Sequence, residues 1–118
     1  MAQQARKGGP ASSGQGDAGA GRVLPSDWVT AGTSPRFACW PGPPPIGPES
    51  YGYLWWLSRA GGRSHFFGWG HGGQFVWVTP ALDLVVVTTA WQNAGSLAPE
   101  LSTNGLDLIV SCVLPAVE

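Results

Sequence analysis

The sequence predicts an α+β fold in which an antiparallel three-stranded sheet carries a C-terminal helix packed on it. Residues 74–79 and 84–90 are apolar runs separated by only four residues, a spacing that favours an antiparallel pair. Residues 51–58 (YGYLWWLS) are rich in aromatic side chains and supply a third strand. Apolar residues then recur at the i, i+3, i+4 and i+7 spacing of one helix face. That stripe consists of Leu106, Ile109, Val110 and Val113.

The chain divides into two parts by composition. Residues 1–21 contain mostly Gly, Ala, Ser and Gln, with no large aliphatic side chain after Met1. Such a segment buries too little apolar surface to offset the entropy cost of ordering, so we expect it to be disordered. Residues 22–118 are expected to form the folded part.

The folded part is expected to begin with a short helix over residues 25–29. Pro25 suits the first turn, and Ser26 or Asp27 would cap it. Trp28 and Val29 would then lie on its buried side.

Turns and loops separate the remaining elements. Residues 33–48 contain many prolines and are expected to form a long surface loop, and residues 59–63 (RAGGR) a turn. Pro80–Asp83 would join the two apolar strands, with Asp83 capping the turn. Pro115 is expected to end the helix.

The charge pattern excludes several classes of partner. Charged residues make up 11% of the chain and the formal net charge is -1, so no clustered basic face is available for nucleic acid. No run of about 20 apolar residues predicts a membrane span. Residues 1–7 do not form the apolar core of a signal peptide, which favours the cytoplasm. Cys39 and Cys112 lack metal-ligand spacing and are expected to be free thiols, a disulfide remaining open only for an exported chain.

The most unusual string is Gly68-Trp69-Gly70-His71-Gly72-Gly73-Gln74. Its glycines match GxGxxG, but a strand follows where a dinucleotide site needs a helix, and no P-loop Lys-Ser/Thr is present. Glycines before and inside the start of a strand let a ligand approach the main chain, whose N–H groups could serve as oxyanion donors. A tight glycine turn with a solvent-exposed histidine is the alternative.

The strings RVLPSDWV, YGYLWWL and GWGHGGQFVWVTPALDLVVVTTA resemble the C-terminal part of the serine β-lactamase-like hydrolases. That family includes class C β-lactamases, related esterases and 6-aminohexanoate-dimer hydrolases. The resemblance covers residues 22–118. It implies that the sheet and C-terminal helix form the C-terminal part of a β-lactamase-like α/β sandwich.

The resemblance also implies roles for four residues. His71, Gly72 and Gly73 would take the places of the family's Lys-Thr-Gly motif, and the backbone N–H of Gln74 would be an oxyanion-hole donor. The implied reaction is ester or amide hydrolysis of a small molecule through an acyl-enzyme, with no metal or organic cofactor. A neutral imidazole binds the carboxylate of a substrate more weakly than a lysine ammonium does. We therefore expect ester or linear amide substrates rather than β-lactams.

The nucleophile side of the family site is missing from this sequence. The family's nucleophile lies in Ser-x-x-Lys, whereas the only lysine here is Lys7, with Gln4 three residues before it. No Tyr-x-Asn occurs either. This chain alone is therefore expected to be inactive, and a complementary N-terminal half is an expected partner.

The sequence allows three other interpretations of its function. Ser64, His71 and Asp83 could form a different catalytic set, although GRSHF is not a nucleophile elbow. A metal site would need His65, His71 and a third ligand. The chain could also be a non-catalytic binding or interaction module with an aromatic-lined surface. Most of the candidate aromatic residues, however, are better explained as core residues. Those candidates are Tyr51, Tyr53, Trp55 and Trp56.

Overall fold

The computed structural model describes residues 2–7, 17–18, 21–39, 47–91, 93 and 95–117. The strands are β1 (Ala2–Lys7), β2 (Asp17–Ala18), β3 (Gly21–Arg22), β4 (Phe37–Ala38), β5 (Ser50–Tyr51), β6 (Trp56–Ala60), β7 (Arg63–Gly70), β8 (Gln74–Thr79) and β9 (Leu84–Thr89). The helical segments are α1 (Ser26–Gly32), η1 (Pro80–Leu82), η2 (Gly95–Leu97), α2 (Ala98–Asp107), the π-helical η3 (Leu108–Val113) and α3 (Leu114–Val117).

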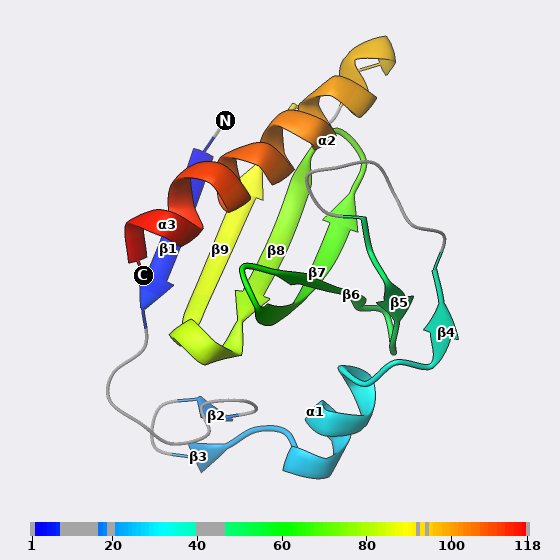
Figure 1. The fold of residues 1–118 in the computed structure, drawn as a ribbon, viewed down its shortest axis with the longest axis vertical. Helices are drawn as coiled ribbons and strands as arrows, with labels where there is room; N and C mark the ends of the chain where they lie inside the picture. The colour runs from blue at the N-terminus through cyan, green and yellow to red at the C-terminus, as the bar shows by residue number, and fades with distance from the viewer. Residues whose placement is uncertain are drawn as a thin grey trace.

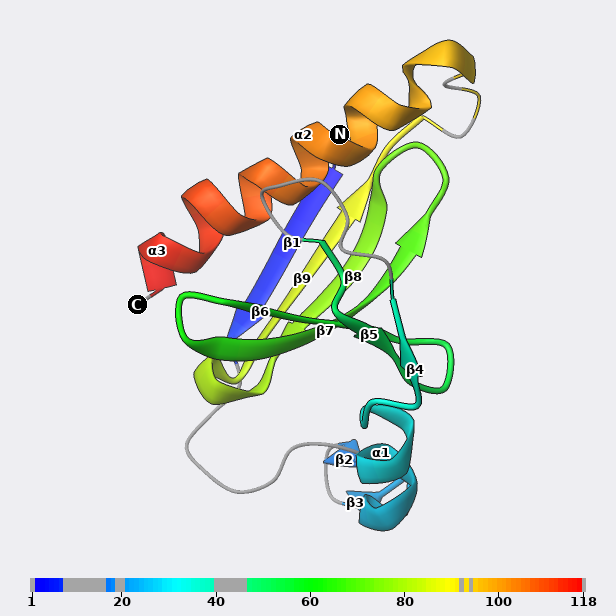
Figure 2. The same cartoon turned by 45° about the vertical axis from the view of Figure 1, so that its right-hand side comes forward.

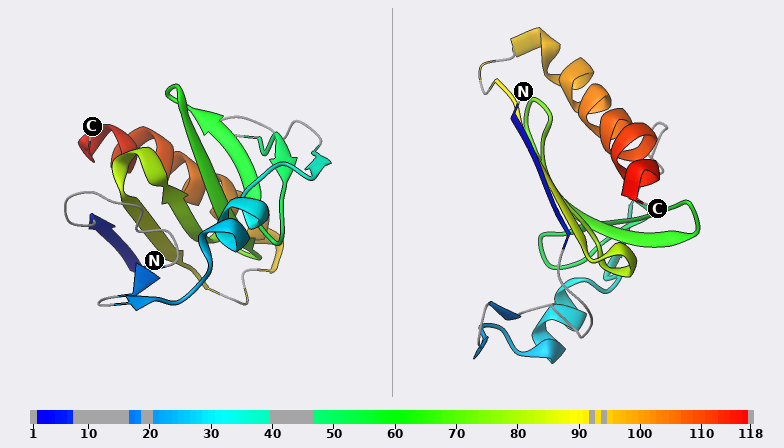
Figure 3. Two further views of the ribbon diagram at one scale, coloured as in Figure 1. Left: turned by 90° about the horizontal axis from the view of Figure 1, so that it is seen from below. Right: turned by 90° about the vertical axis from the view of Figure 1, so that its left-hand side faces the viewer.

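The predicted class is confirmed, but the sheet is larger than the sequence predicted. It has seven strands instead of three, in the order β1-β9-β8-β7-β6-β5-β4, and every neighbouring pair is antiparallel (Figure 1). The run from α2 to α3 lies along one face of this sheet (Figure 3). The C-terminal helix thus covers the sheet as expected.

Half of the difference lies between residues 50 and 70, and the strands β1 and β4 account for the rest. The strand predicted over residues 51–58 is interrupted and appears as β5 and β6, with Leu54 between them at a φ of 64°. The strand β7 was not predicted, because its two glycines, Gly68 and Gly70, obscure the alternation in which His65 and Phe67 are buried. The turn predicted over residues 59–63 is shorter in the structure and consists of Gly61 and Gly62, because Ala60 pairs with Arg63.

The β8–β9 hairpin agrees with the sequence prediction. Phe75 pairs with Thr88, and Thr79 with Leu84, across the two strands. Asp83 ends the connecting η1 at a φ of 48°, and its N–H donates to the carbonyl of Pro80 at 3.0 Å. Asp83 is therefore the turn residue that the sequence predicted.

The N-terminal segment differs from the expected disorder where it is described. Ala2–Lys7 form β1 and pair along the whole of β9, from Ala2 opposite Thr89 to Lys7 opposite Leu84. Asp17–Ala18 pair with Gly21–Arg22. Strand pairing uses main-chain groups, so the edge of β9 can accept a segment whose side chains give no strand pattern. The rest of residues 1–21 lies outside the described residues.

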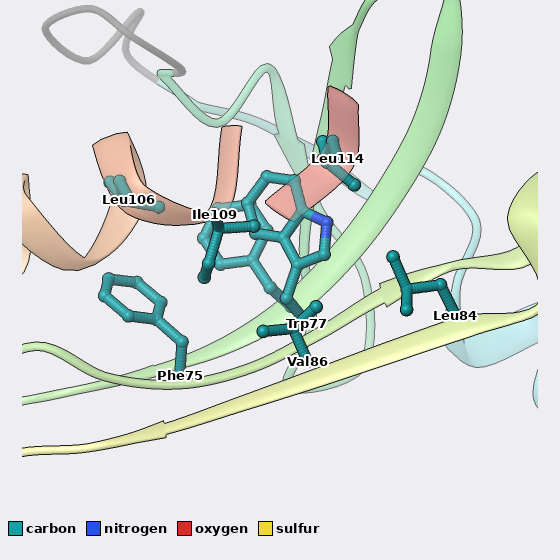
Figure 4. Close-up of a cluster of buried hydrophobic side chains, with 8 residues drawn as sticks. Phe75, Trp77, Leu84, Val86, Leu106, Ile109 and Leu114 are labelled. Atoms are coloured by element: carbon teal, nitrogen blue, oxygen red, sulfur yellow. The ribbon is translucent and has the colours of Figure 1, made fainter. Parts of the chain in front are cut away.

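The core lies between the sheet and the C-terminal helix (Figure 4). Phe67 and Trp77 stack with ring centroids 4.8 Å apart, and Ile109 from the helix is fully buried on them. The buried cluster consists of Phe67, Phe75, Trp77, Leu84, Val86, Leu106, Ile109 and Leu114. Val110 and Val113 are partly buried against it, so the predicted stripe is confirmed.

Pro115 does not end the helix, contrary to the prediction. The N–H of Leu114 donates to the carbonyl of Ile109, five residues earlier, as in a π-helix. Pro115 follows directly after this π-helical turn, whose wider hydrogen-bond spacing accommodates a residue that lacks an N–H.

The helical stretch Gly95–Val117 has 23 residues, and an 18-residue window within it has a mean hydropathy of 1.2, which by length and composition would suffice to cross a membrane. Its exposed side is nevertheless polar, at the spacing of one helix face. The exposed polar residues of α2 and η3 are Glu100, Thr103, Asn104, Asp107 and Ser111, although Leu97 before them and Cys112 after them are exposed as well. This pattern is typical of an amphipathic helix that covers a sheet.

The first helix is longer and more exposed than predicted. Pro25, rather than Ser26 or Asp27, is the N-cap of α1, and no side chain caps it. Trp28 is 58% exposed and Val29 is half-buried, so the expected burial of Trp28 is wrong. The first helix is too short to reach the core and contacts the rest of the fold near Tyr53, whose ring lies 5.8 Å from that of Trp28.

The expected loop over residues 33–48 is described only in part. It includes the short strand β4, which pairs with β5, and a central stretch lies outside the described residues. Cys39 and Cys112 are both free thiols, as predicted.

Candidate functional site

The Gly-His string straddles the turn between β7 and β8. His71, Gly72 and Gly73 form the turn, Gly70 ends β7, and Gln74 begins β8. Gly72 and Gly73 have φ values of 81° and 89°, a conformation that favours glycine. The turn lies at the same end of the sheet as the end of β9 and the first half of α2 (Figure 2).

The turn is packed tightly against the C-terminal helix. A Cβ atom placed on Gly73 would lie 2.5 Å from the carbonyl oxygen of Leu101 in α2. One turn later in α2, a Cβ on Gly105 would lie 3.0 Å from the ring of Phe75. Gly73 is therefore required both by its backbone conformation and by the close approach of the helix.

Thr88 fixes the main chain on both sides of Gln74. Its buried hydroxyl donates to the carbonyl of Gly73 at 2.9 Å and accepts from the N–H of Phe75 at 3.0 Å. Successive N–H groups point to opposite edges of a strand. Because the N–H of Phe75 points to β9, the N–H of Gln74 is directed toward its partner Gly70 in β7.

The side chains at this turn are more accessible than its glycines. His71 is exposed, while Gly72 and Gly73 are buried. The Nε2 of Gln74 donates to the carbonyl of His71 at 3.4 Å. Gln74 also lines an open pocket of about 380 Å³ together with Ala90, Trp91 and Asn93, none of which the sequence reasoning had singled out as a site residue.

The alternative catalytic set is not assembled in this fold. Ser64 and Asp83 lie near the opposite end of the β7–β8 hairpin from His71. Phe66 pairs with Val78 close to that end, Ser64 precedes Phe66, and Asp83 follows the end of β8. The seven residues from Ser64 to His71 span about 20 Å of extended chain. Among the described residues, no three His, Cys, Asp or Glu side chains come together as a metal site.

The aromatic candidates are only half-buried, and none is fully buried as a core residue would be. Tyr51, Trp55 and Trp56 are intermediate in exposure, and Tyr53 is 44% exposed. Of the four, Trp56 alone packs against the core cluster, so the expectation that most of them are core residues is wrong. The guanidinium of Arg36 lies 5.1 Å from the ring centre of Tyr53.

A buried polar network at the other end of the core was not predicted. His65 is 2% exposed, and its Nδ1 lies 2.9 Å from the Oγ1 of Thr79, which also accepts from the indole N–H of Trp77 at 3.0 Å. The Nε2 of His65 lies 3.2 Å from the carbonyl of Ala60. Because that carbonyl can only accept, Nε2 carries the proton and Nδ1 of the neutral ring accepts from Thr79.

Burial lowers the pKa of His65 below its ordinary value of 6.5, and the nearby charge of Arg63 lowers it further, against the opposing effect of the Ala60 carbonyl. Between the folded pKa and 6.5 the unfolded chain binds more protons than the folded one. The free energy of unfolding should therefore be constant above pH 6.5 and fall as the pH drops below it. Urea midpoints measured across this range test the prediction.

The two histidines of the chain provide the control for that measurement. His71→Gln should keep the decline below pH 6.5, because His71 is exposed. His65→Gln should remove the decline. An equal decline in both variants would show that another group is responsible.

Comparisons with known proteins add no relative: no protein-family model matches this chain, and no curated protein matches it at a significant level.

Proposed function

We propose that this chain carries the C-terminal, substrate-binding part of a serine hydrolase of the β-lactamase-like type, acting on small esters or linear amides. The observation that carries the proposal is the exposed imidazole of His71 on the rigid glycine turn that opens β8. Of the sequence strings that resemble this family, the longest, GWGHGGQFVWVTPALDLVVVTTA, contains this turn, whereas RVLPSDWV leads into α1 at the other end of the molecule (Figure 1). The antiparallel strands that follow the turn, covered on one face by a C-terminal helix, are also what the resemblance implies.

In such a hydrolase, an activated hydroxyl attacks the substrate carbonyl and forms a tetrahedral oxyanion. The oxyanion collapses to an acyl-enzyme, the alcohol or amine leaves, and water then releases the acid. We assign to His71 the orientation of the bound acyl group, because its ring is exposed while its neighbouring main chain is fixed. The N–H of Gln74 would act as an oxyanion donor only if its pairing with Gly70 opens, since it is directed toward β7.

The nucleophile and its lysine would come from a segment that is not in this sequence. The face of the sheet opposite α2 supports such a partner, because Val76 and Val85 are 41% and 38% exposed on its central strands. Exposed apolar side chains that lie together on a sheet are usually covered by another segment or chain. In this proposal Ser-x-x-Lys belongs to the covering segment.

The test is to isolate the native protein from its source cells with an antibody against this chain. We expect a species larger than 12.3 kDa, or a stable complex, that contains a Ser-x-x-Lys segment. It should hydrolyse p-nitrophenyl butyrate faster than nitrocefin. A species of 12.3 kDa that hydrolyses neither compound would contradict the proposal.

A substitution of His71 tests its role in that native species. His71→Ala should lower kcat/KM for p-nitrophenyl butyrate by about tenfold or more, because the acyl group would lose its orientation. Trp28→Ala, at an exposed position on α1, is the matched control and should leave the rate unchanged. Equal rates for the two variants would remove His71 from the site.

A further inference from the structure

Trp91 is the most exposed tryptophan among the described residues. It follows directly after β9 and Ala90, and its side chain is 74% exposed. Its indole N–H donates no hydrogen bond to any described residue. Exposing the apolar ring of a tryptophan to water is unfavourable. The Trp91 side chain therefore has a ring face that a ligand could cover and an N–H that could donate a hydrogen bond to it.

The open pocket beside Trp91 is large enough for a small ligand, and its lining is uncharged. Its volume of about 380 Å³ falls in the range of small-molecule sites. Among the described residues it is lined by Gln74, Ala90, Trp91 and Asn93, none of which carries a charge. Such a lining offers an anionic or cationic ligand no ion pair to replace its hydration.

The main chain that carries Gln74 is held in place before any ligand arrives. Thr88 fixes the main chain on both sides of Gln74, through the carbonyl of Gly73 and the N–H of Phe75. Among the described residues, the Gln74 side chain makes one hydrogen bond, a long one of 3.4 Å from its Nε2 to the carbonyl of His71. Its Oε1 is therefore available to accept, and Asn93 adds a second carboxamide.

We propose that this pocket binds a neutral N-acetylated sugar. The apolar face of a sugar ring would stack on the indole of Trp91, as apolar faces stack on aromatic rings. The carboxamides of Gln74 and Asn93 each offer donors and an acceptor, which match both hydroxyl groups and an acetamido group. The fixed main chain at Gln74 lowers part of the entropy cost of binding. This inference does not rest on the hydrolase proposal, since it needs no nucleophile.

The probe is N,N′-diacetylchitobiose, titrated into the full chain and followed through the indole N–H resonances in NMR spectra. We expect one of the tryptophan resonances to shift and saturate below about 10 mM, a typical range for a single weak site. Trp91→Ala should weaken binding by about tenfold or more. Trp28→Ala, which removes another exposed tryptophan, should bind as the parent chain does.

Two further titrations separate the parts of the proposal. Gln74→Ala should weaken binding by several-fold while leaving the dispersion of the spectrum unchanged. Cellobiose, which lacks acetamido groups, should bind at least about fivefold more weakly than the acetylated sugar. The absence of a saturable shift, or equal binding by the Trp91→Ala and Trp28→Ala variants, would overturn the site. Equal binding of the two sugars would overturn the acetamido assignment.

Discussion

Replacing Gly73 with alanine is expected to lower the free energy of unfolding by about 2–5 kcal/mol. Part of this cost is the backbone, because a φ of 89° is unfavourable for an L-residue by roughly 1–2 kcal/mol. The rest is packing, because the new methyl group would lie 2.5 Å from the carbonyl oxygen of Leu101. Overpacking of this kind typically costs about 1–3 kcal/mol. Urea denaturation of the full chain measures the sum.

Gly62→Ala separates these two contributions. Gly62 has a φ of 75° in the β6–β7 turn, and a Cβ placed there meets nothing within 4 Å. Its substitution should therefore cost only the backbone part, roughly 1–2 kcal/mol. The difference between the two variants reports the contact between the β7–β8 turn and α2. Equal losses would mean that the helix moves away from the turn without a penalty.

The sequence predicted those parts of the fold in which side-chain pattern and turn chemistry agree. β8 and β9 are apolar runs separated by a short segment with turn residues, and Asp83 ends that connecting segment. The helix stripe was equally clear. The strand β7 was missed because Gly68 and Gly70 replace the side chains that would show its alternation. The strand β1 is held by main-chain pairing with β9, which leaves no signal in residue types.

The sequence predicted the part of the candidate site that lies in the unusual Gly-His string. It did not predict the contacts that depend on how the strands pair. The glycines and His71 were singled out because their spacing is rare before a strand. The two hydrogen bonds of the Thr88 hydroxyl join residues 13 and 15 positions apart in the sequence. Only the pairing of β8 with β9 brings these residues together. The one available signal was a threonine inside an otherwise apolar run. Trp91 and Asn93 gave no signal, because they follow a strand without any motif.

Thr79→Val is expected to cost about 2–5 kcal/mol although it preserves the shape of the side chain. Thr79 is fully buried, and its hydroxyl accepts from Trp77 and donates to His65. Valine would leave the indole N–H and the imidazole Nδ1 buried without partners. Each unsatisfied buried group costs about 1–3 kcal/mol. Thermal or urea denaturation at pH 7.5 measures the loss while His65 is neutral.

Thr103→Val is the matched control, because Thr103 is exposed and bonds only the carbonyl of Pro99 in its own helix. It should change stability by less than about 0.5 kcal/mol. A double variant with Trp77→Phe then tests the network itself. Once the indole N–H is gone, Thr79→Val should cost less than it does in the parent chain, by the share that the unpaired donor contributed. Full additivity would mean that the hydroxyl matters to His65 alone. A cost of Thr79→Val equal to that of Thr103→Val would mean that this buried chain of hydrogen bonds contributes nothing to the fold.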